Sequence, residues 1–300
     1  MAAHRVIATI PVFRPPSDLG ARVRDLLTQV DRVVLVDDGS HSVRDVDIDD
    51  DRVIRIDGEE NLGIAHALNV AIAEARSLGA THVLTLDQDS AVAEGYVARF
   101  LAALDDPARA GQRIAAAVPE IVGGAAVLRD GDDWAFDPIQ SGQLVPMTVL
   151  DEVGGFDERL FIDAVDSDFT LRAHARGYRF LIVAGERMGH DLGELVPITF
   201  FGRQLVLAGR PRHVLYHRPF RTYYMVRNSV HLVREHGRAD RAWMWLRVRK
   251  MIEMVAGCAI LAPDRAAQVR AVRAGLRDGR RGTLGRIDDG TLRAIEKRRA

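Results

Sequence analysis

The sequence predicts an α/β protein with a mostly parallel sheet flanked by helices, followed by a mainly helical C-terminal region. Three observations lead to this prediction. Short β-branched runs alternate with helical patterns through residues 5–90, as is typical of right-handed crossovers between parallel strands. Two of the runs end in acidic residues, as expected where strand ends of an open sheet border a ligand. Beyond residue 196 the patterns are mainly helical and interrupted by prolines.

Each element of the first half, residues 1–105, follows from its own pattern. Residues 5–13 are a β-branched run that stops at Arg14-Pro15-Pro16, which indicates a buried strand entering a loop. Residues 18–30 then repeat leucine and valine at helical spacing. Further strands and a helix follow in alternation. The strand-like runs are 32–40, 53–63 and 81–90, and the helical segment is 63–78.

The pattern changes beyond residue 105 and indicates a second half, residues 106–195, on the same sheet. Residues 113–122 are strand-like, and the stretch that follows them is turn-rich. Residues 166–176 read as a short helix stopped by Gly177, and a strand follows. We therefore expect one domain over residues 1–195 and a basic, mainly helical region over residues 196–300.

Composition and charge narrow the function classes. With 47% hydrophobic and 28% charged residues, the chain is neither disordered nor an integral membrane protein. The single cysteine, Cys258, excludes an intrachain disulfide framework and a Cys-rich zinc site. Together with the lack of a signal-like N-terminus, this predicts a cytoplasmic setting.

The charge is distributed unevenly. Residues 1–195 hold 18 Arg against 34 Asp and Glu, whereas residues 196–300 hold 23 Lys and Arg against 8 acids. A basic half is drawn to phosphate, in a lipid headgroup or a nucleic acid. Solvated arginine-rich helix faces give the same count, so the charge alone does not choose between these readings.

Two acidic clusters end strands of the predicted sheet and would face one crevice. Asp37-Asp38-Gly39-Ser40 ends one strand, and Asp87-Gln88-Asp89-Ser90 ends another. A D-x-D spacing lets two carboxylates converge on one hard divalent cation, which leaves other coordination positions to diphosphate oxygens. The clusters therefore indicate a metal–diphosphate site.

The chain carries no Gly-rich phosphate loop that would compete with this reading. Neither G-x-x-x-x-G-K-[ST] nor G-x-G-x-x-G follows the first strand. The sequence therefore lacks the main feature that would indicate a kinase, a P-loop enzyme or a nicotinamide-dependent dehydrogenase. A nucleotidyltransferase also uses paired acids with Mg2+, but the loop PVFRPPSDLG lacks the glycines and lysine that a triphosphate needs.

A set of segments occurs in consistent order along roughly residues 5–235, and together they resemble the inverting family 2 glycosyltransferases with the GT-A fold, in their rhamnosyltransferase-like branch. The segments are ATIPVF, VVLVDDGS, NLGIAHALNVAI, VLTLDQDS, SGQLVP, VGGFDERLFIDAVDSDFTLRAHARGY, GHDLGE and RTYYMVRNSVHLVRE. The resemblance implies transfer of a sugar from a nucleotide diphosphosugar to an acceptor hydroxyl, with inversion. It makes residues 1–195 the GT-A catalytic domain.

The resemblance also implies roles for individual residues around the donor. Asp89 would be a direct ligand of Mg2+ or Mn2+, Asp87 would lie near the ribose or the metal, and the late His190 would face the metal or diphosphate. The remaining nucleotide-binding positions are Pro11, Val12, Asp37, Asp38, Asn61 and Gly63.

On the acceptor side, the resemblance centres on two segments. In VDSDFTLR, Asp166 would be the base that takes the acceptor proton, with Asp163 and Asp168 as alternatives. Val165 stands where the family usually has another acid, and Asp168 is equally suited to capping a helix. Residues 154–156, Gly-Gly-Phe, resemble an acceptor-side loop in which an aromatic ring supports a sugar; a tight turn with a buried Phe is the alternative.

The C-terminal region carries an aromatic and basic series over residues 220–250. Arg with Trp and Tyr at helical spacing suits an interfacial helix against anionic lipid, and core packing with a solvated face explains the same stripe. The run MIEMVAGCAILAP is too short to span a bilayer. No nucleic-acid recognition motif is present, so nucleic acid is not expected as a partner.

The resulting expectation is an inverting, metal-dependent transferase of L-rhamnose from dTDP-L-rhamnose to a saccharide or polyprenyl-linked acceptor in surface-polysaccharide synthesis. It would act in the cytoplasm, with peripheral contact to the inner face of the plasma membrane. The alternatives are another donor, such as UDP-galactofuranose or a UDP-hexose, and a non-catalytic GT-A-like binding module.

Overall fold

The computed structural model describes residues 4–189, 194–200, 203–207 and 210–297. The chain divides into two units. The first comprises Met1–Phe161 and Val165–Asp191, and the second comprises Ile162–Ala164 and Leu192–Ala300. The division after residue 191 lies close to the expected boundary at 195. The sequence did not indicate that the short segment 162–164 groups with the second unit.

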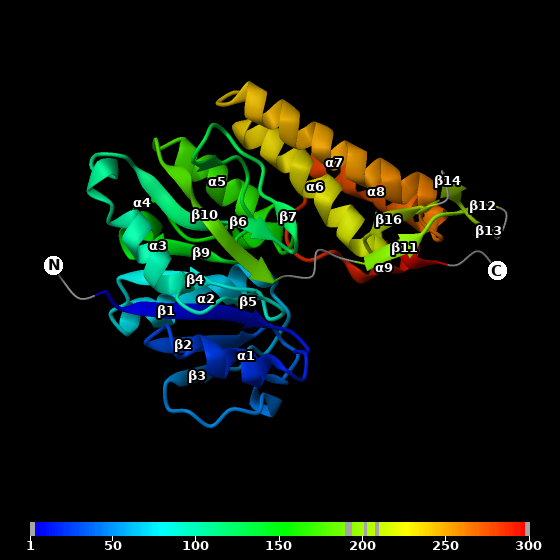
Figure 1. The fold of residues 1–300 in the computed structure, drawn as a ribbon. Coiled ribbons are helices and arrows are strands. Elements are labelled where there is room, and N and C mark those ends of the chain that lie inside the picture. The colour runs from blue at the N-terminus through cyan, green and yellow to red at the C-terminus, as the bar shows by residue number, and fades with distance from the viewer. Residues whose placement is uncertain (1–3, 190–193, 201–202, 208–209, 298–300) are drawn as a thin grey trace. The chain divides into compact units, whose positions relative to one another are not determined.

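The first unit is a three-layer α/β structure (Figure 1). Its strands are β1 (Val6–Val12), β2 (Arg32–Asp37), β3 (Val53–Ile56), β4 (His82–Thr85), β5 (Ala91–Val92), β6 (Ile114–Val122), β7 (Ala125–Ala126), β8 (Trp134–Ala135), β9 (Gln143–Pro146) and β10 (Arg179–Gly189). Its helices are α1 (Leu19–Leu26), α2 (Ile64–Ser77), α3 (Tyr96–Leu104), α4 (Met147–Val153) and α5 (Val165–His174). Short 3₁₀ turns lie at Val43–Asp45, Pro107–Arg109 and Glu158–Leu160.

The strand order of the sheet is β3-β2-β1-β4-β9-β6-β10-β5. Strands β3, β2, β1 and β4 run parallel, as do β6 and β10, whereas β9 and β5 are antiparallel to their neighbours. Val12 is in register with Asp37, and Thr9 is in register with Thr85. The carboxyl ends of β1, β2 and β4 therefore share one edge, and the predicted mostly parallel sheet is confirmed.

Alternate residues of the central strands pack into two separate apolar layers, one on each face of the sheet. Ile7 of β1 packs with Leu68 of α2 and with Phe169 of α5 in one cluster. Ala8 and Ile10 of the same strand contribute to a second cluster, which contains side chains of α1 and α3. This alternation follows from the two-residue period of a strand. A sheet buried on both faces gives the acidic loops at its edge a rigid base.

The second unit is mainly helical but begins with short strands. The antiparallel pairs are β11 (Glu194–Pro197) with β16 (His213–Tyr216), β12 (Thr199–Phe200) with β13 (Arg203–Gln204), and β14 (Val206–Leu207) with β15 (Arg210–Pro211). The helices are α6 (Pro219–His236), α7 (Arg241–Leu261), α8 (Arg265–Arg281) and α9 (Asp289–Glu296). The region is mainly helical, as expected, and its first helix begins at Pro219 after these short strands.

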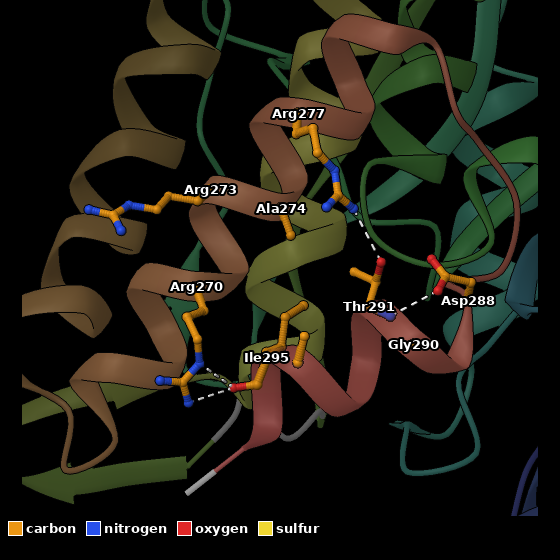
Figure 2. Close-up of a pocket in the computed structure, with 9 residues that line it drawn as sticks. Arg270, Arg273, Ala274, Arg277, Asp288, Gly290, Thr291 and Ile295 are labelled. Carbon is orange, nitrogen blue, oxygen red and sulfur yellow. Dashed lines mark hydrogen bonds between the residues drawn. The ribbon is translucent and has the colours of Figure 1, made fainter. Parts of the chain in front are cut away.

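Helix α8 is held to two of its neighbouring helices, α6 and α9, by specific contacts. A Cβ at Gly275 would lie 2.7 Å from the Tyr223 carbonyl oxygen of α6, so glycine allows the two backbones to approach closely. On the other side, Figure 2 shows arginines of α8 reaching α9: Arg270 donates to the Ile295 carbonyl at 2.8 and 3.0 Å, and Arg277 donates to Thr291 Oγ1 at 3.1 Å. Arginine side chains of this unit therefore also serve as internal hydrogen-bond donors.

Candidate functional site

The loops that follow β1, β2 and β4 are tied to one another by hydrogen bonds. The amide of Gln88 bonds in both directions with the Phe13 backbone: Phe13 N donates to Gln88 Oε1 at 2.9 Å, and Gln88 Nε2 donates to the Phe13 carbonyl at 3.1 Å. Arg14 N donates to Ser40 Oγ at 3.0 Å. The two predicted acidic clusters thus lie at one edge of the sheet, on loops that brace each other.

Asp37 is the centre of the loop after β2. The residue is 1% exposed, and its carboxylate accepts four backbone N–H groups and one hydroxyl. The donors are Ser40 N at 2.5 Å, His41 N at 3.0 Å, Ser42 N at 2.8 Å, Val43 N at 2.9 Å and Ser40 Oγ at 3.0 Å. Burial alone would raise the pKa of Asp37, but the bonds from Ser40, Ser42 and Val43 outweigh it and lower the pKa. Its carboxylate therefore organises the loop.

Asp38 joins that loop to the start of α2. Asp38 Oδ1 accepts Leu62 N at 2.8 Å and Gly63 N at 3.0 Å. Burial raises the pKa of Asp38, although these N–H groups act in the opposite direction. Gly63 has φ +97°, and a Cβ there would lie 2.4 Å from the Phe161 carbonyl oxygen. Glycine is therefore required where the helix start meets the chain just before α5. Asn61, in the same loop, is half-buried.

The D-x-D residues follow β4 directly and are half-buried. Asp87 N donates to Ser141 Oγ at 2.9 Å, and the Asp87 carboxylate accepts from Gln140 Nε2. The carbonyl of Asp89 accepts from Arg22 of α1. Contacts from separate parts of the chain thus fix the backbone and one carboxylate of this segment.

The acids after β4 fit a divalent cation. Within the ranges that the structure describes, no group of three or more His, Cys, Asp or Glu is arranged to hold a metal. Mg2+, however, is commonly bound by one or two carboxylates together with substrate phosphates. Asp87 and Asp89 supply two carboxylates at the sheet edge, which is the donor set that such a shared site needs. His190 lies outside the described residues.

The three acids around the start of α5 have different surroundings. Asp166 is half-buried in the first turn, where its Oδ1 accepts Ser167 N at 2.8 Å. Asp168 is 3% exposed and accepts Arg172 Nε at 2.7 Å. Asp163 belongs to the second unit, where it forms an ion pair with Arg221 at 2.6 Å. Asp168 and Asp163 are thus each held by an arginine.

The expected acceptor-side loop is part of the core. A Cβ at Gly155 would lie 2.4 Å from Asn69 Oδ1, and Asn69 also bonds the Phe156 backbone in both directions, at 2.8 and 2.9 Å. Phe156 is 4% exposed, and its ring packs at 5.2 Å from the Phe169 ring. This agrees with the alternative of a tight turn with a buried Phe, and the acceptor-side role of residues 154–156 stays a prediction. Gly154, with φ +87°, ends α4.

Burial also describes two further sets of predicted residues, whose roles stay predictions. Pro11 and Val12 are buried residues of β1, so the loop at its carboxyl end begins at Phe13. In the C-terminal series, Tyr223, Tyr224 and Trp243 are buried in the second unit, because α6 and α7 turn these rings inward. Trp245 is 65% exposed. No helix in the described ranges has both the length and the apolar character that crossing a bilayer demands.

Sequence reasoning missed the polar side chains that brace these acids. Gln140 and Ser141 hold Asp87, and Ser167 Oγ donates to Asp137 Oδ2 at 2.9 Å beside Asp166. The run Gln140-Ser141-Gly142 lies between β8 and β9 and could have drawn attention as a polar segment in an apolar context. Asn69 sits among alanines of α2 and gave no such signal.

Comparisons with known proteins agree with this arrangement. Residues 8–122 match the family model described as Glycosyl transferase family 2. The dTDP-rhamnosyl transferase RfbF of Shigella flexneri is 26% identical over 257 residues, which cover 77% of this chain and 80% of that protein. The segment matched by the family model runs from β1 to the end of β6 and contains both acidic loops, whereas α5 lies beyond it.

Solved structures show the same fold. The structure of S. aureus TarS has a TM-score of 0.53 and 13% identity, covering 97% of this chain and 55% of that chain. Its fragment 1–349 in complex with UDP-GlcNAc has a TM-score of 0.50 and 16% identity, covering 95% of both chains. The same fragment in complex with UDP has a TM-score of 0.51 and 15% identity, again covering 95% of both chains. At such identities the likeness concerns the fold.

Proposed function

We propose that this chain, a glycosyltransferase with a family 2 domain and the GT-A fold, transfers L-rhamnose from dTDP-L-rhamnose to a hydroxyl of a saccharide or lipid-linked acceptor, with inversion. The observation that carries the proposal is the convergence of the loops after β1, β2 and β4 at one sheet edge, braced by Gln88 and Ser40. The choice of donor is supported by the likeness to a dTDP-rhamnosyl transferase.

The donor nucleotide would bind along this edge. Asp37 would act through the loop that it organises, whose backbone borders the crevice, while Asp38 and Asn61 would contact the base and ribose. Because Gly63 has no side chain, the start of α2 can lie close to the backbone of Phe161. The strand ends at a switch in strand order are the usual place for a nucleotide in an open α/β sheet.

Asp89 and Asp87 would hold Mg2+ or Mn2+ together with the donor diphosphate. When bound, the cation supplies positive charge that stabilises the departing nucleoside diphosphate. Gln140 donates to Asp87 Oδ1 and thereby fixes the orientation of that carboxylate. Asp87 would therefore already be oriented when the cation or the ribose binds.

Replacing Asp89 by Ala is expected to abolish the metal-dependent part of donor binding, because it removes one of two protein carboxylates from a site with few protein ligands. Calorimetric titration with dTDP-L-rhamnose, with and without Mn2+, measures this part directly. The matched control is Glu94→Ala, an exposed acid in the same region. Metal-dependent binding that survives in Asp89→Ala would remove Asp89 from the ligand set.

The acceptor hydroxyl must lose a proton as its oxygen forms the new bond to the anomeric carbon and the bond to the diphosphate oxygen breaks. Asp166 would accept this proton. It is a half-buried carboxylate at the start of α5, five residues after Phe161, whose backbone meets Gly63 of the donor loop. Asp163 and Asp168, each paired with an arginine, are the alternatives.

A different nucleotide sugar is the main alternative, and a thermal-shift and calorimetric screen separates the two. The panel contains dTDP-L-rhamnose, UDP-galactofuranose, UDP-glucose and the free nucleotides, each with and without Mg2+ or Mn2+. We expect the largest metal-dependent stabilisation with dTDP-L-rhamnose. A preference for a UDP-sugar would change the donor, and no response to any nucleotide sugar would favour the non-catalytic module.

We further propose that α7 contacts an anionic membrane surface, which would place the enzyme on the cytoplasmic side of the plasma membrane. Trp245 is exposed, and the Arg249 guanidinium lies 5.1 Å from its ring centroid. Rings and cations side by side suit the headgroup region. The basic charge of the C-terminal region supports the same reading.

Changing Arg247, Arg249 and Lys250 together to Gln is expected to weaken binding to anionic vesicles by about 1 kcal/mol per residue at low salt, and to leave binding to neutral vesicles unchanged. Co-sedimentation with phosphatidylglycerol and phosphatidylcholine vesicles measures both. Equal binding of the variant and the parent to anionic vesicles would assign these side chains to an ordinary solvated surface.

A further inference from the structure

The four residues before α5 have an unusual backbone. Phe161, Asp163 and Ala164 have φ values of +67°, +64° and +62°, although none of them is glycine. A positive φ is sterically unfavourable for residues other than glycine, and Asp and Asn adopt it more readily than other side chains do. Such conformations persist only where neighbouring groups enforce them, and they cluster at functional sites. The segment therefore needs an external restraint.

Helix α6 provides that restraint. Arg221 Nη2 donates to Asp163 Oδ1 at 2.6 Å, and Arg221 Nε lies 3.3 Å from Oδ2, so the guanidinium faces both carboxylate oxygens. Asn228 Nδ2 donates to the carbonyls of Ile162 and Asp163, at 2.9 and 2.8 Å. Arg221 and Asn228 are about two helical turns apart, hence on the same face of α6. Segment 162–164 is thus held through both its side chain and its backbone.

The side chain of Asn228 is itself fixed in orientation. It is fully buried, and its Oδ1 accepts Arg227 Nε at 2.9 Å. Arg227 is also fully buried, with its guanidinium 4.7 Å from the centroid of the Tyr224 ring and its Nη1 donating to the Gly285 carbonyl at 2.5 Å. The amide oxygen is therefore occupied by Arg227, which leaves the amide nitrogen for the two carbonyls.

From these contacts we propose that Arg221 and Asn228 are positioning residues for the base. They fix the backbone of residues 162–164 and thereby the orientation of Asp166, which follows two residues later. Val165, the first residue of α5, is covalently joined to Ala164, and Asp166 follows it. Only two soft dihedrals per residue link the held segment to the carboxylate-bearing residue. The inference rests on the proposed role of Asp166 and adds two residues that do not touch the reacting atoms.

The test compares Arg221→Met with Arg221→Lys and Asp163→Asn. We expect Arg221→Met to lower kcat by about 10–100-fold, the size of effect that misplacement of a catalytic group by about 1 Å produces. The donor Kd measured by calorimetry should stay unchanged, because the donor loops do not include this segment. Arg221→Lys keeps the charge and should recover part of kcat. Asp163→Asn keeps a side chain that tolerates a positive φ, so its kcat should lie between those of Arg221→Met and Arg221→Lys.

Arg238→Met is the matched control, since Arg238 is an exposed arginine after the end of α6; its kcat should equal that of the parent. A second experiment places Arg221→Met in an Asp166→Asn enzyme. If Arg221 acts through Asp166, the added substitution lowers kcat no further, because coupled residues are non-additive. A further loss of the same size as in the parent would overturn the inference, and so would a normal kcat in Arg221→Met.

These results also separate the inference from the proposed function. If Asp166→Asn alone retains normal transfer, the base is misassigned whatever Arg221→Met does. If Asp166→Asn is inactive and the Arg221 variants are fully active, the base assignment stands and the positioning role is wrong.

Discussion

Replacing Asp166 by Asn is expected to lower the rate of sugar transfer by about 10²–10⁴-fold, the usual contribution of a general base. The amide is nearly the same size as the carboxylate, and the oxygen of the introduced amide could still accept Ser167 N, as Asp166 Oδ1 does at 2.8 Å. The local fold of α5 should therefore survive while the proton acceptor is lost. Single-turnover transfer from dTDP-L-rhamnose measures the effect, with donor affinity measured separately by calorimetry.

Asp151→Asn is the matched control for this experiment, because Asp151 is an exposed acid paired with Arg76 across a surface salt bridge. Surface pairs of this kind contribute about 0–1 kcal/mol, so the control should be active and folded. Transfer by Asp166→Asn within a few-fold of the parent, about 0.6 kcal/mol or less in barrier height, would move the base to Asp163 or Asp168.

Replacing Asp37 by Ala is expected to lower the free energy of unfolding by about 3 kcal/mol or more, because four backbone N–H groups then lose their acceptor. Asp37→Asn should cost less. One of its side-chain atoms remains an oxygen and can keep the pair of donors that now meets Oδ1, namely Ser40 N and His41 N. Urea unfolding of the two variants and the parent measures the difference. Equal stability of Asp37→Ala and the parent would contradict the assigned role.

The same residue predicts a pH dependence with a definite sign. The pKa of Asp37 is lower in the folded protein than its ordinary value. Its charged form thus stabilises the fold fully above the unfolded pKa of about 3.9, and this contribution disappears as the pH falls through the folded pKa. The stability gap between the parent and Asp37→Asn should therefore be largest above about pH 5 and shrink below about pH 4. A gap that widens on acidification would exclude this linkage.

The parts of the fold that sequence predicts are those set by local patterns. The parallel strands and helices α1, α2 and α5 follow from period and from turn residues close in the chain, and the structure confirms them. Helices α3 and α4 were missed. Helix α3 begins after Gly95, which has φ +73°, and α4 begins after Pro146, so neither helix start has a side-chain N-cap that its sequence would signal.

The candidate site also has features that the sequence predicts and features that it does not. The acids at strand ends could be predicted because the local pattern of each strand shows where the strand ends. The side chains that contact each acid could not be predicted, because Gln140 is 53 residues from Asp87 and Arg221 is 58 residues from Asp163. Burial of Phe156 likewise depends on α2 and α5, which sequence spacing does not place against it. The assigned roles of the acids stay predictions.

The membership of segment 162–164 in the second unit has a consequence for biosynthesis. A ribosome releases the chain from its N-terminus, and early units begin to fold while later ones are still being made. Strands β1 to β9 and their helices emerge first, but the left-handed residues before α5 meet Arg221 and Asn228 only after α6 has been synthesised. The nascent chain would thus complete much of its sheet while Asp166, the proposed proton acceptor, is not yet fixed in place. With the roles proposed above, the order of translation would disfavour sugar transfer by an unfinished chain on the ribosome.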